Sequence, residues 1–141
     1  MKNIIAWVLA LSVLACGTSN ETNDGGNDAG PDSPLNGCTT ATLTDRTAGG
    51  ASRVIALSSS AFSPPCMRVA VGQTVTFQGD FNSHPMRPGV NPGGLEAEGV
   101  NPIPIVNSGT SVDVTFSGAG TFPFYCAVHH SFGMRGVIVA Q

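Results

Sequence analysis

Apolar and polar residues alternate in two short runs of the chain. In residues 73–78 a valine and a phenylalanine alternate with polar residues, and in residues 111–116 two valines and a phenylalanine do the same. This period of two predicts strands with one buried face. Other β-branched runs between turns also predict strands, at residues 53–58, 67–71, 121–126 and 135–140. Short strands without helical periodicity predict an all-β domain, either an antiparallel sandwich or a barrel.

A long segment, residues 87–110, separates the two groups of strands. It contains four prolines and five glycines, which interrupt both periodicities. We predict a surface loop that crosses between two sheets, with one helical turn at residues 95–98.

The first residues have a different pattern, a lysine and then an apolar run that ends at Cys16. The run is too short to cross a bilayer as a helix, and it predicts a secretory signal peptide at residues 1–15. Residues 13–16, VLAC, resemble the lipobox of bacterial lipoproteins. The resemblance implies cleavage before Cys16 and lipidation of its thiol. The alternative is ordinary cleavage that leaves a free Cys16.

Residues 16–37 are polar, and all their charges are acidic. Such a composition predicts a flexible, lipid-anchored linker that holds a folded domain, residues 38–141, off the membrane. The protein is then exported and anchored to the bacterial cell envelope. Glycine follows Cys16, which does not resemble the aspartate signal for retention in the inner membrane. We therefore expect the periplasm and the outer membrane.

The predicted domain is formally neutral, because five arginines balance five acidic residues from residue 38 onwards. It has no basic patch of the kind that binds nucleic acid, and we expect no nucleic-acid partner. Nor does its net charge favour the steering of a charged partner.

Residues 122–136 concentrate soft donor side chains. Cys126 is followed by His129 and Met134, and Gly133 lets the chain turn back. One histidine lies outside this stretch, His84, shortly after the predicted strand at residues 73–78. A thiolate, two imidazoles and a thioether together suit copper, and the thiolate with the thioether suits Cu(I) in particular.

The same residues resemble the copper loop of plastocyanin-type cupredoxins. Residues 121–134, TFPFYCAVHHSFGM, have that family's two residues between Cys and His and four between His and Met. Residues 62–89, with a G-x-x-V-x-F strand before the first histidine, resemble the family as well. The resemblance implies a Greek-key β-sandwich and one type 1 copper ion. The implied ligands are His84, Cys126, His129 and, more weakly, Met134.

The resemblance also implies where electrons enter and leave. In the family, the outer edge of the C-terminal histidine ligand reaches the surface through an apolar patch. That histidine corresponds to His129, and we expect a redox protein partner to dock near it. The residues expected to form the patch are Pro85, Met86, Pro88 and Phe132.

Position 85 departs from the plastocyanin pattern. There the residue after the first histidine donates its backbone N–H to the thiolate sulfur, whereas Pro85 has no N–H. Val128 stands where plastocyanins carry proline, so an N–H is available at that position. We hypothesise that one donor has been exchanged for the other.

The chain has four cysteines. If Cys16 is lipidated and Cys126 binds metal, Cys38 and Cys66 remain, and in an exported protein we predict a disulfide between them. The rival pairing joins Cys126 to Cys38 or Cys66 and leaves one thiol free.

The candidate ligands and their neighbours could also have other roles. Cys126 could be a buried structural thiol beside a surface His129, and a Cys-His-His set can also bind zinc. We predict that His130 is a solvent-facing neighbour, because adjacent residues in an extended loop point apart. Met67 and Met86 are predicted to pack in the core, with Met86 as the alternative axial donor.

The leading functional interpretation is a monomeric carrier of single electrons between redox partners at the cell envelope. The alternative is a periplasmic copper carrier or buffer with the same ligands. Three histidines, two of them ligands, cannot build a trinuclear or type 2 copper centre, so we expect no catalysis. A binuclear copper-A centre needs a second cysteine in the loop. A cupredoxin fold that has lost its copper is disfavoured by the presence of all four ligands.

Overall fold

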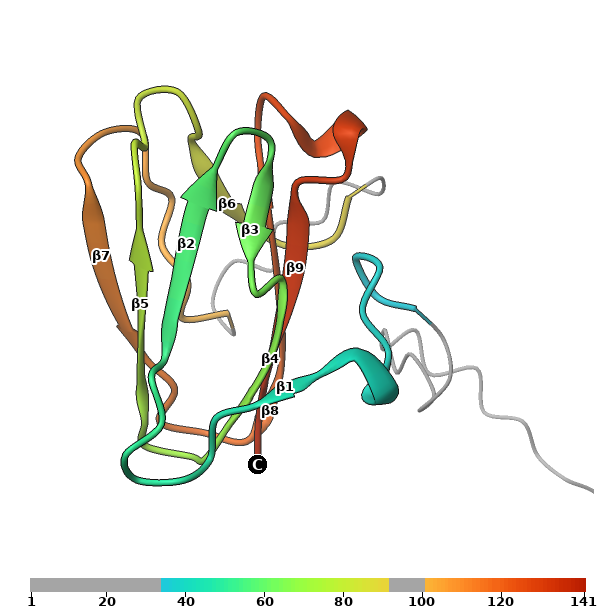
Figure 1. Ribbon diagram of the computed structural model, residues 1–141, viewed down its shortest axis with the longest axis vertical. Helices are drawn as coiled ribbons and strands as arrows, with labels where there is room; N and C mark the ends of the chain where they lie inside the picture. The colour runs from blue at the N-terminus through green and yellow to red at the C-terminus, as the bar shows by residue number, and fades with distance from the viewer. Residues whose placement is uncertain (1–33, 92–100) are drawn as a thin grey trace, which may run out of the picture.

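The computed structural model describes residues 34–91 and 101–141. The predicted signal peptide, Cys16 and the predicted helical turn at residues 95–98 lie outside the described residues. Two β-sheets pack face to face around an apolar core (Figure 1). The predicted all-β sandwich is thereby confirmed.

One sheet has five strands in the order β1-β4-β9-β8-β6. Their bounds are β1 (Thr44–Asp45), β4 (Cys66–Val69), β9 (Arg135–Ala140), β8 (Gly120–Cys126) and β6 (Met86–Pro88). β8 runs antiparallel to both β9 and β6, whereas β4 runs parallel to both β1 and β9. The strand β9 therefore lies in the middle of this sheet.

The second sheet has four strands in the order β3-β2-β5-β7. Their bounds are β3 (Ala61–Ser63), β2 (Val54–Ser58), β5 (Thr74–Gln78) and β7 (Ser111–Thr115). The alternation in the sequence has the expected effect, since Val75 and Phe77 of β5 are fully buried. The threonines between and before them face outwards and bond across to β7.

The expected antiparallel pairing holds for only some of the neighbouring strands. Three neighbouring pairs run parallel, namely β1–β4, β4–β9 and β2–β5. Parallel neighbours need a crossover connection instead of a hairpin. Between β4 and β9, for example, the chain passes through β5 and β7 of the opposite sheet. The pattern within one strand says nothing about which strand it pairs with, so the sequence did not show this.

The prediction that residues 87–110 form a surface loop is partly wrong for the described residues: most of residues 101–110 are exposed and irregular, but other parts of the segment belong to the sheet or the core. The strand β6 continues to Pro88, and Val106 forms an isolated bridge with Met86. Two backbone hydrogen bonds of 2.8 and 3.0 Å make this bridge. Ile103 is only 2% exposed and packs into the core. A bridge and a short strand are too brief to leave an alternating pattern.

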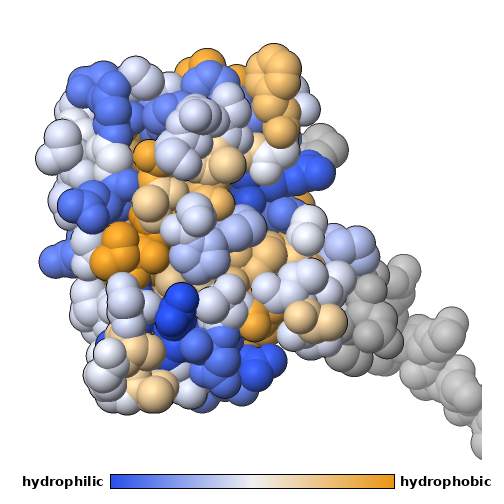
Figure 2. Space-filling view, viewed as in Figure 1, coloured by the Kyte–Doolittle hydropathy of each residue, from blue (hydrophilic) through white to orange (hydrophobic). Residues whose placement is uncertain are grey.

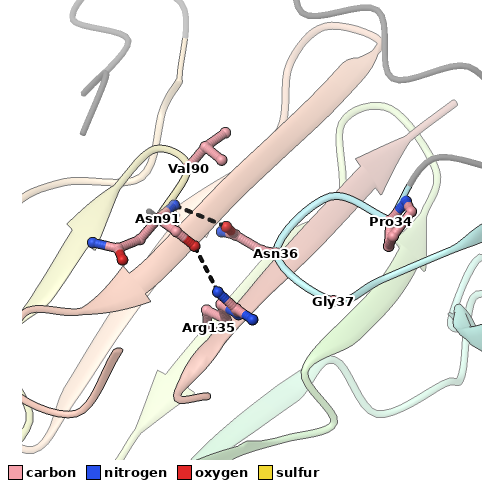
Figure 3. A pocket seen from close by; sticks show the side chains of 6 residues that line it. All are labelled: Pro34, Asn36, Gly37, Val90, Asn91 and Arg135. Carbon is pink, nitrogen blue, oxygen red and sulfur yellow. Dashed lines mark hydrogen bonds between the residues drawn. The ribbon is translucent and has the colours of Figure 1, made fainter. Parts of the chain in front are cut away.

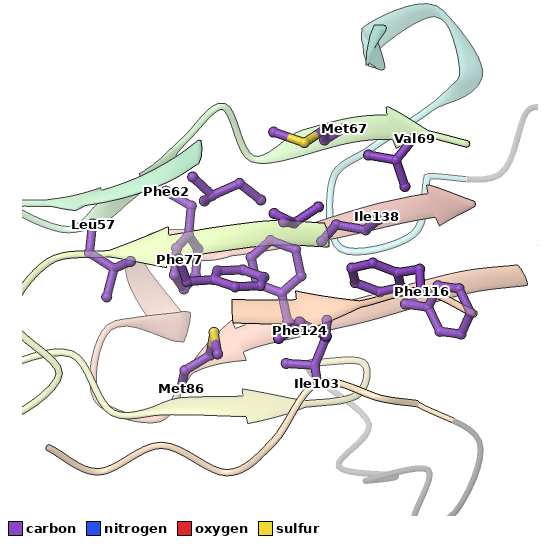
Figure 4. Close-up of a cluster of buried hydrophobic side chains, with 14 of the residues drawn as sticks. Leu57, Phe62, Met67, Val69, Phe77, Met86, Ile103, Phe116, Phe124 and Ile138 are labelled. Atoms are coloured by element: carbon purple, nitrogen blue, oxygen red, sulfur yellow. The ribbon is translucent and has the colours of Figure 1, made fainter. Parts of the chain in front are cut away.

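Phenylalanine rings fill the centre of the core (Figure 4). The ring of Phe124 on β8 meets the rings of Phe62 and Phe77 edge-on, with centroid distances of 4.9 and 5.1 Å. Edge-to-face contacts of this kind stabilise beyond the burial of area alone. Because Phe124 and Cys126 are two residues apart, they share one face of β8. The packing of Phe124 thus fixes the end of the strand that carries Cys126.

The packed domain starts earlier than the predicted boundary at residue 38. Leu35 and Cys38 bond reciprocally through their backbones, at 3.0 and 2.8 Å, and Asn36 between them is buried. A disulfide joins Cys38 to Cys66 of β4, with 5.6 Å between their Cα atoms. This is the pair that the sequence analysis favoured. The predicted linker, residues 16–37, therefore includes residues that belong to the fold.

Two short 3₁₀ helices complete the described part of the chain. They are η1 (Thr40–Thr42) and η2 (His130–Phe132). Neither of these helices has the length or apolar composition needed to cross a membrane.

Candidate metal centre

His84 lies at the end of a short loop that follows β5, and Asp80 organises this loop. The backbone carbonyl of Asp80 accepts a hydrogen bond from His84 N–H at 3.0 Å. Its carboxylate accepts hydrogen bonds from the Ser83 hydroxyl and from the backbone and side chain of Asn82. These bonds, the one from Ser83 first, lower the pKa of Asp80 from 3.8 to about 2. The side chain of Phe81 anchors the loop to the domain, because it is fully buried in the core.

Cys126 is the last residue of β8, and two backbone hydrogen bonds hold it against both neighbouring segments. Its own N–H donates to the carbonyl of Met134 at 2.9 Å. The next N–H, that of Ala127, donates to the carbonyl of Pro85 at 2.8 Å. The first bond closes the loop between Cys126 and Met134. The second ties that loop to the residue that follows His84.

The loop between β8 and β9 turns back on itself through η2. The carbonyl of His129 accepts hydrogen bonds from Phe132 N–H at 3.0 Å and from Met134 N–H at 3.2 Å. Gly133 lies between these two donors with a φ of 90°, a left-handed conformation that glycine adopts without strain. This turn returns the chain to the start of β9 and leaves Met134 fully buried.

Three of the four predicted ligands come together. His84 Nδ1 lies 3.1 Å from His129 Nδ1, which lies 3.6 Å from Cys126 Sγ. The ligand atoms of the three residues all lie within 4.8 Å of one another. An ion about 2.0 Å from each nitrogen and about 2.3 Å from the sulfur spans such separations. The residues therefore fit one metal ion.

Burial differs among the three. Cys126 is fully buried, His84 is 9% exposed and His129 is half-buried. This convergence disfavours the alternative in which Cys126 is a structural thiol and His129 an unrelated surface residue. Within residues 34–91 and 101–141 there is no second group of three His, Cys, Asp or Glu side chains placed to hold a metal.

The donor set also bears on which metal fits. One thiolate and two imidazoles in a closed, mostly buried site are soft enough for copper. Met134 is fully buried and joined through its backbone to Cys126 and His129, so it lies in the same segment of the site. Its role as the weak axial ligand stays a prediction.

Met67 and Met86 lie in the core as predicted, whereas His130 is half-buried and does not simply face the solvent. Met67 and Met86 are fully buried in the core, and Met86 stands opposite Cys126 in the register of β6 and β8. His130 Nδ1 donates to the carbonyl of Ala127 at 3.1 Å. Its ring lies edge-on to Tyr125, with 6.0 Å between the ring centroids. His130 is thus engaged with the backbone and with Tyr125 and is not part of the three-residue group.

The predicted apolar patch is partly wrong. Met86 and Pro88 are buried, because both lie in β6 and face the interior. Phe132 is 77% exposed and Val128, which the prediction of the patch omitted, is 57% exposed. The Phe132 ring lies 6.4 Å from the His129 ring between centroids. Phe132 and Val128 thus expose apolar surface in the loop that contains η2. Figure 2 shows apolar residues among polar ones at this end of the molecule, and others along the middle of the same face.

Comparison with known proteins places this arrangement among copper proteins. A family model described as copper binding proteins, plastocyanin/azurin family, matches residues 54–141. The plastocyanin A/B of Petroselinum crispum is 31% identical over 89 residues, which cover 57% of this chain and 87% of that protein. The chloroplastic plastocyanin of Physcomitrium patens is 33% identical over 84 residues, 57% of this chain. The match spans only 50% of that moss protein's length.

Solved structures of the same kind align with this chain. A reduced amicyanin mutant gives a TM-score of 0.48 at 26% identity, over 67% of this chain and 86% of that chain. Oxidised plastocyanin from Dryopteris crassirhizoma gives a TM-score of 0.44 at 20% identity, over 62% and 99% respectively.

Proposed function

Because the chain belongs to the plastocyanin/azurin family of copper-binding proteins, we propose that it is a carrier of single electrons with one type 1 copper ion. The proposed ligands are His84, Cys126, His129 and, more weakly, Met134. The observation that carries this proposal is the convergence of one thiol and two imidazole nitrogens within 4.8 Å. Family membership supports copper as the metal in place of zinc.

Bound copper supplies the one-electron change, and a site intermediate between the preferences of Cu(II) and Cu(I) keeps reorganisation small. The chain contributes rigidity to such a site. Cys126 is held at the end of β8 by its bond to Met134, and His84 is held by the Asp80 loop. The Ala127–Pro85 bond fixes these two segments relative to each other. Donors held in this way need not move when the charge at the site changes.

His129 is the proposed port for electrons. Of the three converging ligands it is the one that is half-buried, and the exposed side chains of Phe132 and Val128 belong to the same loop. An apolar surface next to a ligand suits a weak and short-lived contact with a redox protein. We propose that such a partner docks there.

The location of the protein is part of the proposal. The apolar run before Cys16 and its lipobox-like end support export and lipidation, and hence attachment to the cell envelope. Glycine after Cys16 supports the outer membrane, and we propose that the protein works there as a monomer.

The test is an optical spectrum of the purified mature protein after addition of Cu(II). We expect an intense band near roughly 600 nm from copper–thiolate charge transfer, bleached reversibly by ascorbate. Cys126→Ser should abolish the band, whereas His130→Ala, which alters the neighbouring histidine, should leave it unchanged. A pale product that instead binds Cu(I) tightly would contradict the electron-carrier proposal and favour a copper carrier or buffer.

A further inference from the structure

The N-terminal hairpin, Leu35–Cys38, precedes residue 54, where the match to the family model begins. Its two central residues have positive φ angles, 49° at Asn36 and 82° at Gly37. This is the type I′ geometry that an Asn-Gly pair favours most strongly. The disulfide then attaches the Cys38 end of the hairpin to β4. The hairpin is therefore a rigid part of the fold.

The hairpin presents one buried polar side chain, that of Asn36, which is 7% exposed. Its Nδ2 donates to the carbonyls of Gly89, Phe124 and Gly136 at 3.1, 2.9 and 3.1 Å. Its Oδ1 accepts a hydrogen bond from Asn91 N–H at 3.0 Å. The two amide hydrogens thus serve three carbonyls, and every polar atom of the side chain has a partner.

The three carbonyls belong to the three segments that carry the proposed ligands. Gly89 follows β6, which begins just after His84, while Phe124 lies in β8 and Gly136 in β9. Phe124 is two residues before Cys126, about 7 Å along an extended strand. Gly136 is two residues after Met134.

We propose that Asn36 is a positioning residue of the metal site. Its amide bonds near the ends of β8 and β9 that carry Cys126 and Met134, and to Gly89, which follows the end of β6 that lies away from His84. It thereby holds the three short segments at a fixed spacing, and through them the ligands. The inference rests on the proposed function for the identity of the metal. Its structural part, that Asn36 keeps the ligand segments in place in the metal-free protein, does not depend on which metal binds.

The neighbourhood of Asn36 extends the same network (Figure 3). Arg135, the residue after Met134, donates to the carbonyl of Asn91 at 2.8 Å, and the N–H of Asn91 donates to Asn36. An open pocket of about 270 Å³ lies between these groups. Its lining residues are Pro34, Asn36, Gly37, Val90, Asn91 and Arg135. The start of β9 is thus tied to Asn36 twice, through Gly136 and through Arg135.

Asparagine satisfies two separate demands at position 36. The positive φ favours Asn, Asp or Gly over residues with a larger or branched Cβ. The three carbonyls require a donor, which a carboxylate is not and glycine lacks. Asn36→Gly therefore keeps the turn and removes the amide. Asn36→Asp keeps the shape of the side chain and places an acceptor against three acceptors.

A matched control is available in Asn101. Its Nδ2 donates to the carbonyl of Pro123 in β8 at 2.7 Å, and its Oδ1 accepts from Ile103 N–H at 3.1 Å. Asn101 therefore also joins another segment to β8, but it bonds to that strand alone and to neither β6 nor β9. Asn101→Gly removes a comparable amide and leaves every hydrogen bond of Asn36 in place, and the carbonyl of Pro123 keeps its bond from Gly89 N–H at 2.8 Å.

The first experiment measures backbone amide hydrogen exchange by NMR in the mature, metal-free protein. The amides of Cys126 and Ala127 report on the ligand segments, because they bond to Met134 and Pro85. The amides of Gly72 and Phe116, which bond near the far ends of β5 and β7, serve as references. In Asn36→Gly we expect exchange at the first pair to accelerate roughly tenfold relative to the references, as loss of buried hydrogen bonds would cause. In Asn101→Gly the ratio should keep its wild-type value.

The second experiment adds copper and measures Cu(II) affinity together with the optical and electron paramagnetic resonance spectra. Loss of a group that hydrogen-bonds a metal ligand directly typically alters metal affinity about 10- to 100-fold. Asn36 bonds to the segments that carry the ligands and to none of the ligands themselves. For Asn36→Gly and Asn36→Asp we expect a loss near the lower end of that range and a changed copper hyperfine splitting. Asn101→Gly should retain the wild-type spectrum.

The outcomes separate the two proposals. If wild-type protein gives no copper–thiolate band, the proposed function fails, while hydrogen exchange still tests Asn36. Equal acceleration at all four amides, or none, would show that Asn36 has only a general structural role and would overturn the inference. An unchanged copper spectrum in both Asn36 variants would overturn it as well.

Discussion

Removal of the disulfide between Cys38 and Cys66 should destabilise the domain by an amount that the loop length sets. The two cysteines are 28 residues apart in the sequence. In the chain-entropy model, opening a loop of this length restores enough freedom to the unfolded chain to cost about 3.5 kcal/mol. Both half-cystines are 5% exposed and pack with Val137, so truncating them to alanine also leaves small voids. We therefore expect Cys38→Ala with Cys66→Ala to lower the free energy of unfolding by about 3.5 to 5 kcal/mol.

The assay is urea denaturation of the metal-free protein, followed by the fluorescence of Tyr125 and by circular dichroism. Wild-type protein treated with a phosphine reductant provides the control, since it loses the cross-link but keeps both side chains. Reduction alone should account for most of the loss. A decrease of less than about 1 kcal/mol in the double variant would refute the reasoning, because it would mean that the unfolded chain gains little freedom.

Three further predictions follow from the site and the core. Phe124→Ala should lower the free energy of unfolding by about 3 to 5 kcal/mol, because it empties the centre of the core. Phe132→Ala, at a residue that is 77% exposed, should change it by less than about 0.5 kcal/mol. Equal effects of the two substitutions would contradict the assigned packing. The pKa of Asp80 is lowered to about 2 by its bonds to Ser83 and Asn82, so its carboxylate stabilises the fold above the unfolded pKa and this contribution is lost as the pH falls from about 4 to about 2. Asp80→Asn should flatten the decline of metal-free stability in that range, and an unaltered slope would exclude this role. Pro85→Ala restores an N–H next to the thiolate and should raise the reduction potential measured by voltammetry; an unchanged potential would refute the hypothesis of exchanged donors.

The sequence revealed those features that a local pattern encodes. The strands β5 and β7 alternate with period two, so both could be predicted to within a residue of their observed bounds. Cys126, His129 and Met134 could be predicted as ligands because they lie close together in the sequence, within the one loop between β8 and β9. His84 could be chosen because it is the one histidine of the sequence that lies outside this loop.

Features that depend on distant partners escaped the sequence analysis. β6 is only three residues long and contains a proline, and its burial comes from pairing with β8. This explains why Met86 and Pro88 were wrongly assigned to an exposed patch. The Asn36-Gly37 pair is itself a strong hairpin signal. It was overlooked because the polar composition around it indicated a linker, and composition cannot show the three carbonyls that Asn36 meets.

The central position of β9 in the five-stranded sheet has a consequence for the order in which the parts of the domain assemble. β9 follows every other described strand in the chain, yet it lies between β4 and β8. While the chain is still being synthesised, that gap stays open and the carbonyl of Met134 cannot yet meet Cys126. The proposed ligands therefore come together only after the last of the described strands has paired, so the metal site is among the last parts of the domain to form.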